Sequence, residues 1–263
     1  NSAADDAAGF AIAERMTAQI RGLNMATKNA NDGLSMLATV ENATNDVTDM
    51  LQRIRELAVQ AANDTNSLED RTFLQTEVNS LLQEINRVAT HTIYNNKVVL
   101  DGNLSGDFQV GTEKGQTISF AITSIDTDVL GLTDATGALT FATGTYDINV
   151  SVPTALSTGT AGAISILTAT AATDSLEKIS AALEKVAGNR AEYGALQNRL
   201  EYTVSNLMNV AEFTTSARSR IEDADFAAES ARLAKAQVLQ QTGTAMLAQA
   251  NAAPQLALQL IRN

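Results

Sequence analysis

The sequence predicts a mainly α-helical protein with a small β part. We expect a rod of long antiparallel helices packed like a coiled coil, a central insertion rich in β-hairpins and a protruding C-terminal helix. Three long segments repeat apolar residues at alternating steps of three and four, which is the spacing of coiled-coil helices. Between the second and third segments, apolar and polar residues alternate one by one, as in strands. A fourth helical segment is left at the C-terminus without a partner.

The first helix is expected to run from Asp5 to Ala62, a stretch that contains no proline. At about 1.5 Å per residue it would extend for on the order of 85 Å. Two glycines, Gly22 and Gly33, lie inside its pattern. Its narrow apolar stripe, or seam, consists of Met16, Ile20, Leu23, Ala30, Leu34, Leu37, Val47, Leu51, Ile54, Ala58 and Ala61.

The second helix should begin after a short polar break. Ser67 and Asp70 have the spacing of a helix N-cap and its acidic partner. The helix should end near His91, and the short connection makes it antiparallel to the first. Its seam consists of Leu74, Val78, Leu81, Ile85 and Val88.

From Tyr94 the sequence favours strands and turns. The residues Glu113–Gly115 separate two alternating runs and should turn a hairpin. A further strand is expected within residues 143–152, and the whole insertion is expected to end where Thr173 and Asp174 restart a helix.

The third helix has a seam of ten unbroken steps. Arg190 and Gln197 are its polar exceptions, and polar seam residues typically fix the register of packed helices. The seam consists of Leu176, Ile179, Leu183, Val186, Arg190, Tyr193, Gln197, Leu200, Val204, Leu207 and Ala211.

The last helix is expected from Asp223 to about Ala253. Glu222, Asp223 and Asp225 should stabilise its N-terminus, and Pro254 should kink or interrupt it. An apolar helix without a partner should bind another chain. Its candidate contact residues are Phe226, Leu233, Val238, Leu239, Met246 and Leu247, with Leu256 and Leu258 beyond the proline.

These elements predict three regions. Residues 5–97 with 174–216 would form a discontinuous helical domain, residues 98–173 a β-rich central region with a reduced outer part, and residues 217–263 a terminal-helix segment. Because the chain starts at Asn1 within ordered sequence, we expect it to be truncated at its N-terminus.

Composition excludes several classes of partner and chemistry. The net charge of −12 and the pI near 4.5 argue against nucleic acid and anionic membranes. No run of about 20 apolar residues is present, so we expect no membrane insertion. Cysteine is absent, which removes disulfides and thiolate chemistry.

No motif for catalysis, a cofactor or a metal stands out. The only histidine, His91, cannot form a two-histidine metal site or a standard triad alone. Residues 111–117 have three residues rather than four between their glycines and lack the G-K-[ST] of a phosphate loop. Asp126 and Asp128 begin like a calcium loop, but Gly137 occupies the position that needs a glutamate. We therefore expect no enzyme, no cofactor and no metal.

Several motifs resemble the conserved ends of bacterial flagellins. NSAADDAAGFAIAERMTAQIRGLNMATKNANDGLSM and LQRIRELAVQAANDTNS resemble the N-terminal region of that family. GALQNRLEYTVSNL, SARSRIEDADFAAE and QVLQQTGTAMLAQAN resemble its C-terminal region, and FQVGTEKGQTISF resembles its β-hairpin segment. The resemblance implies a subunit of the flagellar filament, outside the cell, exported without a cleaved signal peptide.

The resemblance also implies partners. These are other flagellin subunits, an export chaperone, the cap and hook-associated proteins, and the innate immune receptor TLR5. The family's TLR5 site falls here on Arg53, Leu57 and Glu77. By their pattern alone, Arg53 and Glu77 belong to a solvated charged face. The same residues would pack between neighbouring subunits.

Two alternatives remain open at the level of sequence. One is the hook–filament junction protein, which shares the end motifs. The other is a surface module that binds polysaccharide or host surfaces through the central region, although we do not expect that region to have the exposed aromatic residues of a sugar platform.

Overall fold

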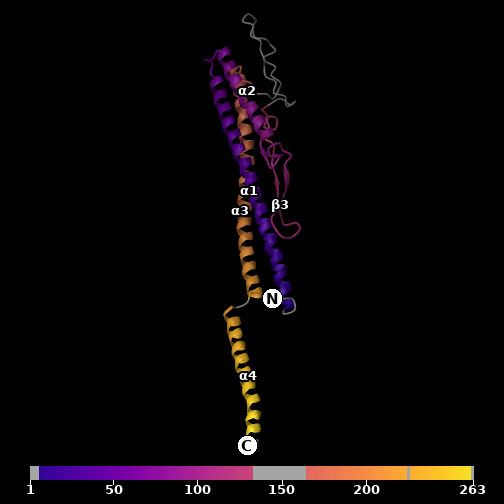
Figure 1. Ribbon diagram of the computed structural model, residues 1–263. Coiled ribbons are helices and arrows are strands. Elements are labelled where there is room, and N and C mark those ends of the chain that lie inside the picture. Colours follow the sequence, from indigo (N-terminus) through magenta and orange to yellow (C-terminus); the bar gives the residue numbers. More distant parts are fainter. Residues whose placement is uncertain (1–5, 133–163, 224–225, 262–263) are drawn as a thin grey trace. The chain divides into compact units, whose positions relative to one another are not determined.

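The protein is described here by a computed structural model that covers residues 6–132, 164–223 and 226–261, with side chains up to residue 250 (Figure 1). Helices account for most of the described residues, and the strands are few and short, so the expected fold class is confirmed. Contacts divide the chain into two compact units. One is Gln19–Ala211, and the other combines Asn1–Ala18 with Glu212–Asn263.

Helix α1 spans Ala7–Ala61, close to the expected bounds. The Asp6 side chain accepts hydrogen bonds from the backbone N–H groups of Ala8 (3.1 Å) and Gly9 (2.9 Å) and so caps the helix. The predicted seam is confirmed, because each of its positions is buried or half-buried. The fully enclosed members include Ala30, Leu37, Val47, Leu51, Ile54, Ala58 and Ala61.

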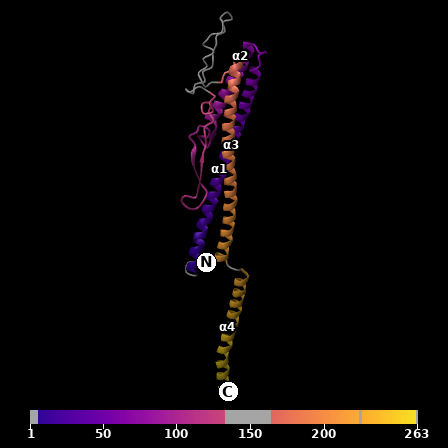
Figure 2. The ribbon, with the colours of Figure 1, turned by 180° about the vertical axis from the view of Figure 1, so that it is seen from behind.

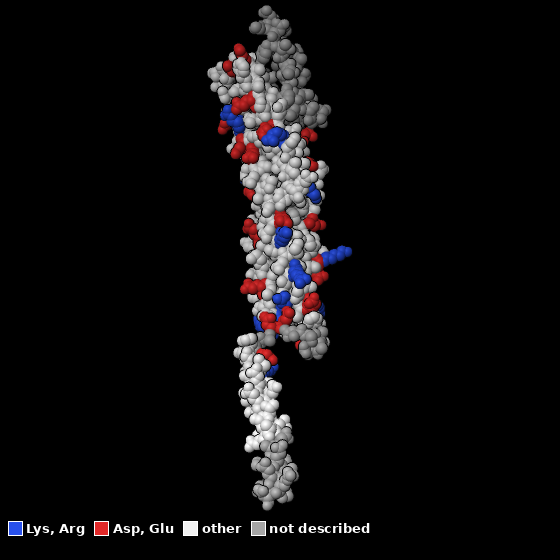
Figure 3. All heavy atoms as spheres, in the orientation of Figure 1, with Lys and Arg blue, Asp and Glu red and all other residues white. Residues whose placement is uncertain are grey.

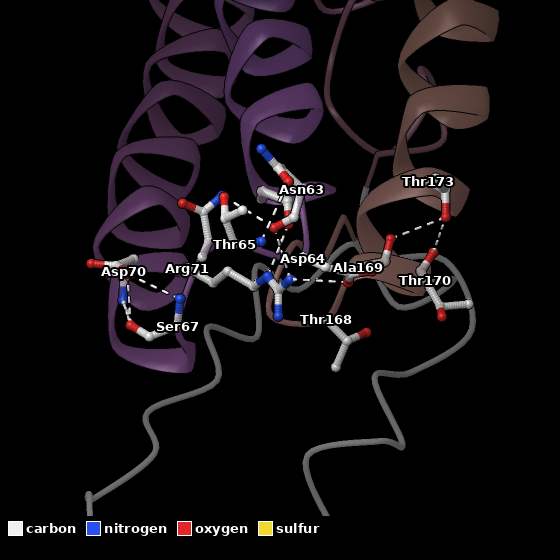
Figure 4. Close-up of polar contacts among 12 residues, drawn as sticks. Asn63, Asp64, Thr65, Ser67, Asp70, Arg71, Thr168, Ala169, Thr170 and Thr173 are labelled. Atoms are coloured by element: carbon white, nitrogen blue, oxygen red, sulfur yellow. Dashed lines mark hydrogen bonds and ion pairs between the residues drawn. The ribbon is translucent and has the colours of Figure 1, made fainter.

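Helix α2 spans Leu68–His91 and begins with the predicted cap (Figure 4). Ser67 Oγ accepts from the Asp70 N–H (3.2 Å), and Asp70 Oδ2 accepts from the Ser67 N–H (3.0 Å). Arg71 donates to the carbonyls of Ala61 (2.8 Å) and Asn63 (3.1 Å), at and just beyond the end of α1. Carbonyls at a helix C-terminus lack partners within the helix, so Arg71 ties the two helices together at their connection.

The seam of α2 is turned slightly from the expected one. Val78, Ile85 and Val88 are buried as predicted, whereas Leu82 and Ala89 are more enclosed than Leu74 and Leu81. Residues of α1, α3 and the β-structure belong to the same apolar cluster as those of α2, so the buried side of α2 is wider than one stripe.

Two hairpins follow α2. Strands β1 (Ile93–Tyr94) and β2 (Lys97–Val98) are antiparallel, and β3 (Ser105–Gln109) pairs antiparallel with β4 (Thr117–Ala121). Gly115 has a φ of 87°, a left-handed conformation that suits glycine, so the predicted hairpin turn is confirmed. The strand expected within residues 143–152 lies outside the described residues.

The β3–β4 hairpin packs against α1 and α3, and two views place it beside α1 (Figures 1 and 2). Phe108 of β3 stacks on Phe120 of β4 with ring centroids 4.3 Å apart. The Asn29 side chain of α1 donates to the Gln109 carbonyl (3.1 Å). The shared apolar cluster contains Ala30, Leu37, Ile118 and Leu200, with Phe108 at its margin.

Helix α3 spans Ala169–Glu222, so the expected start at Thr173 is wrong. Thr168 provides the earlier start, because its Oγ1 accepts from the Ala171 N–H (3.1 Å). Every predicted seam position of α3 is buried or half-buried. Leu200 shares a cluster with Leu37 of α1, and Leu207 shares one with Leu23, so α3 runs antiparallel to α1 within the unit Gln19–Ala211.

Of the two polar seam residues, Gln197 pairs across helices. Its Nε2 donates to Glu41 Oε2 of α1 at 3.0 Å. This bond connects one position of α3 to one position of α1 and fits the register role that the sequence predicts.

Helix α4 spans Phe226–Ile261, which corrects two expectations. The last helix does not begin at Asp223, since α3 continues through the charged segment to Glu222 and the Ser219 hydroxyl of α3 donates to the Asp223 carboxylate. Pro254 does not interrupt α4. An interior proline removes one backbone donor and crowds the carbonyl four residues earlier, yet α4 continues through it to Ile261. Within the described residues, no helix is both long and apolar enough to span a membrane.

Candidate interaction surfaces

Arg53 lies at the centre of an ion-pair group on the surface of α1 and α2. Its Nε donates to Glu77 Oε1 across the two helices at 2.8 Å, and its Nη1 donates to Glu56 Oε2 on the same helix at 2.9 Å. All three side chains are substantially exposed. The Arg53–Glu77 pair therefore joins two helices and remains accessible to a partner.

The electrostatics of this group follow from its hydrogen bonds. The hydrogen bonds that Arg53 donates to Glu77 and then to Glu56 raise the pKa of Arg53 above its usual value, so the guanidinium stays charged. Exposed ion pairs add little to stability, because water and salt screen them. The group can instead offer an oriented planar donor and carboxylate oxygens to another molecule.

Leu57 does not share this surface, which corrects its expected role as a receptor contact. Its side chain is 1% exposed and packs in the main apolar cluster. Leu57 lies four residues after Arg53, which is only about 40° further round α1, but that rotation brings it closer to the buried residues Ile54 and Ala58. It can support the helix that carries Arg53, but this structure leaves it no direct contact with a partner.

Phe73 is a surface residue that the sequence pattern did not single out. It lies four residues before Glu77 on α2, hence on the same face of the helix, and is 66% exposed. The only sequence feature that could have identified it is its position, which lies outside the apolar seam and close to the helix cap. The surface formed by Arg53, Glu56, Phe73 and Glu77, called here the α1–α2 surface, thus combines charge with an exposed aromatic ring.

Helix α4 carries the largest exposed apolar set in the described part of the chain. Each of its side chains from Phe226 to Ala250 is exposed. Its visible surface carries charge only near its beginning (Figure 3). The exposed apolar residues are Phe226, Leu233, Val238, Leu239, Met246 and Leu247, which are the predicted contact residues. Leu256 and Leu258 lie in the helix beyond the described side chains.

The apolar residues of α4 point in several directions. At about 100° per residue, Leu233 and Leu247 fall on one side, Leu239 and Met246 lie roughly a quarter to a third of a turn away, and Val238 lies nearly opposite the first pair. A helix that is apolar on several sides is normally surrounded by other helices. One partner helix would leave part of α4 uncovered.

Other positions considered for chemistry have plain structural roles. His91 is exposed at the end of α2, where its Nδ1 lies 2.8 Å from Thr90 Oγ1. Residues 111–117 contain the hairpin turn, and the Leu130 N–H donates to the Asp126 carbonyl (3.0 Å) within a second turn. Among the described residues, no three His, Cys, Asp or Glu side chains are grouped to hold a metal.

A hollow of about 510 Å³ lies beside α1, but all its lining residues belong to that one helix. In the described part of the chain, one helix alone lines the hollow. The lining residues are Gln52, Arg55, Glu56, Val59 and Gln60.

Comparisons with known proteins point in one direction. Residues 1–105 match the family model described as the bacterial flagellin N-terminal helical region, and residues 176–261 match the bacterial flagellin C-terminal helical region. Flagellin of Bacillus subtilis (strain 168) is 40% identical, in an alignment that covers all of this chain and 88% of that protein.

Solved structures agree on the fold. The crystal structure of Bacillus cereus flagellin aligns with a TM-score of 0.51 and 26% identity, covering 68% of this chain and 88% of that one. A Vibrio parahaemolyticus protein assigned as flagellar hook-associated aligns with a TM-score of 0.62, covering 83% of this chain and all of that one. Because the identity is only 15%, this second similarity supports the fold and nothing further.

Proposed function

The chain belongs to the bacterial flagellin family and is a structural subunit of the flagellar filament, and from this premise we propose which of its surfaces build the filament. The proposal rests on one observation above all. Helix α4 exposes six large apolar side chains that nothing in the described chain covers. A filament of identical subunits would supply the missing partners.

Assembly through α4 is favoured by the free energy of burying its apolar side chains. Complete burial of a Leu, Val, Met or Phe side chain contributes about 1.5–3 kcal/mol. Several such residues on each subunit would offset the cost of ordering the subunit in a polymer. Because the apolar residues face several directions, we propose that α4 packs against more than one helix, and we keep Leu256 and Leu258 among the contacts. The segment 217–263 is then the proposed assembly region of the chain.

We propose a second contact region on the α1–α2 surface. In the assembled filament it would pack against neighbouring subunits, and on a free subunit it would be the site for TLR5, as the resemblance implies for Arg53 and Glu77. Support comes from their exposure and from the bond between them, which holds both side chains in one orientation. Leu57 would act only by positioning Arg53.

The remaining partners are also proposals. An export chaperone would cover exposed α4 before assembly, and cap and hook-associated proteins would meet the ends of the filament. The subunit would reach the outside of the cell without a cleaved signal peptide. The family is structural, and we propose that this chain has no catalytic activity.

Electron microscopy of the full-length protein, incubated with short filament seeds under salting-out conditions, tests the polymer proposal. We expect the seeds to lengthen with the added protein. A protein that remains monomeric at all seed concentrations would contradict the proposed role of its surfaces.

A further inference from the structure

The segment Ile164–Leu167 enters the helical unit just before α3, and its residues belong to no helix or strand. Ile164, Ile166 and Leu167 are buried. Buried backbone N–H and C=O groups need hydrogen-bond partners, and a strand normally obtains them from neighbouring strands. Here most of the hydrogen-bond partners are side chains of the neighbouring helices.

Gln75 of α2 satisfies one side of the segment. Its Oε1 accepts from the Ile166 N–H at 2.7 Å, and its Nε2 donates to the Ile164 carbonyl at 3.4 Å. The side chain is itself buried, and its Nε2 also donates to Asn79 Oδ1 at 2.8 Å. A glutamine amide offers an acceptor and a donor side by side, as the backbone of an adjacent strand does.

Ser175 of α3 satisfies the other side. Its Oγ donates to the Ser165 carbonyl at 2.9 Å and accepts from the Ser165 N–H at 3.2 Å, and the serine is 1% exposed. The Ile164 N–H donates to the Leu132 carbonyl at 3.2 Å. Side chains from two helices and one carbonyl therefore satisfy five consecutive backbone groups.

We propose that Gln75 and Ser175 form a clamp that takes the place of two neighbouring strands. The clamp fixes Ile164–Leu167 between α2 and α3, so that the first turn of α3 keeps its structure whatever sequence lies between Leu132 and Ile164. The Leu132–Ile164 bond supports this role, because it brings both ends of that stretch to one point on the helical unit. Neither the filament role nor the α1–α2 surface enters the proposal.

Hydrogen exchange, resolved at single amides in the full-length chain, tests the clamp. Gln75→Met keeps the volume and removes both bonds, and Ser175→Ala removes the bonds to Ser165. We expect exchange to become at least tenfold faster at Ile166 in the first variant and at Ser165 in the second. Leu51, in the core of α1, should be unchanged in both.

Asn79→Ala is the matched control, since it removes a bond to Gln75 but none to the segment. It should leave the Ile166 amide unchanged. Unchanged exchange at Ile166 in Gln75→Met would overturn the clamp, and so would an equal acceleration at Ile166 and Leu51, because the variant would then act only on global stability.

A second experiment tests the independence of α3. Residues 133–163 are replaced by a flexible linker of about ten residues, which is long enough to join two adjacent points. With the clamp intact, the Ala172 amide, which donates to Thr168, should keep its protection. When Gln75→Met is added to the linker variant, the Ala172 amide should lose its protection from exchange. Loss of protection from the linker alone would overturn the proposal.

Discussion

Gly33 of α1 lies in close contact with the ring of Phe108 of β3. A Cβ placed on Gly33 would come within 3.0 Å of two ring carbons, closer than ordinary van der Waals contact. Phe108 cannot easily withdraw, because it stacks on Phe120. The glycine therefore permits the hairpin to lie against the helix, at a known cost to the helix itself.

Gly33→Ala should accordingly destabilise the protein. The helix gains about 1 kcal/mol from alanine, but displacing a packed ring costs about 1–3 kcal/mol. We expect a net loss of stability in urea unfolding followed by circular dichroism. Gly188→Ala is the control, since nothing lies within 4 Å of its added Cβ, and it should stabilise the protein. A stabilised Gly33→Ala variant would show that the hairpin does not lie against α1.

Tyr193 carries a buried hydroxyl next to the backbone of Thr123, and among the described residues it has no hydrogen-bond partner with good geometry. Tyr193→Phe removes this unsatisfied group and should be neutral or stabilising by about 1 kcal/mol at pH 8. Tyr202→Phe, at an exposed position, should have no effect. A clear loss of stability in Tyr193→Phe would mean that the hydroxyl has a partner.

The same residue predicts a pH dependence. Burial raises the pKa of Tyr193 above its usual value of 10. The folded state therefore binds the phenol proton more tightly than the unfolded state does. The contribution of this proton to the free energy of unfolding is complete below pH 10 and is lost as the pH rises through the raised pKa. Urea unfolding of wild type and Tyr193→Phe should diverge above pH 10, with the variant favoured. Parallel curves from pH 8 to 11 would contradict a buried phenol.

The capping box of α2 makes a further prediction. Ser67→Ala removes the acceptor for the Asp70 N–H and should cost about 1 kcal/mol in urea unfolding. The hydrogen bonds from Ser67 also lower the pKa of Asp70. The charged Asp70 carboxylate therefore adds to the free energy of unfolding above its unfolded pKa, and this addition is lost as the pH falls through the lowered pKa. Ser80→Ala, in the exposed middle of α2, should be neutral or mildly stabilising.

The α1–α2 surface can be tested with receptor signalling. Arg53→Ala and Glu77→Ala should each weaken TLR5 activation by the monomer, because each removes half of an oriented pair. Their thermal stability should change little, since exposed ion pairs contribute little. Arg87→Ala breaks a different exposed pair with Glu84 and serves as the control. If Arg53→Ala and Arg87→Ala have the same potency as wild type, the receptor proposal fails.

Sequence periodicity predicted the long helices and the side on which they pack. The predicted apolar seams are the sides that are buried, from Met16 to Ala61 on α1 and from Leu176 to Ala211 on α3. Burial of a periodic apolar stripe dominates helix packing. The cap at Ser67 and the turn at Gly115 were also predictable, since each uses a short local motif.

Boundaries and tertiary roles were harder to predict. The start of α3 depends on a single threonine cap at Thr168, so the polar residues at Thr173 and Asp174 predicted it too late. Pro254 lies within α4, so its presence wrongly predicted an interruption of that helix. The burial of Leu57 and the exposure of Phe73 depend on how α1 and α2 rotate against each other. Gln75 looks like an ordinary polar residue in the sequence, because its partners lie 89 and 91 residues away.

Seeded filament growth of the full-length protein tests the central claim most directly, with α4 altered at one position. Leu233→Glu places a charge among the exposed apolar residues, whereas Gln241→Glu adds the same charge on a side of α4 that lacks large apolar residues. Electron microscopy should show long filaments for wild type and Gln241→Glu, and seeds without growth for Leu233→Glu. Equal filament growth by both variants would contradict assembly through the apolar residues of α4.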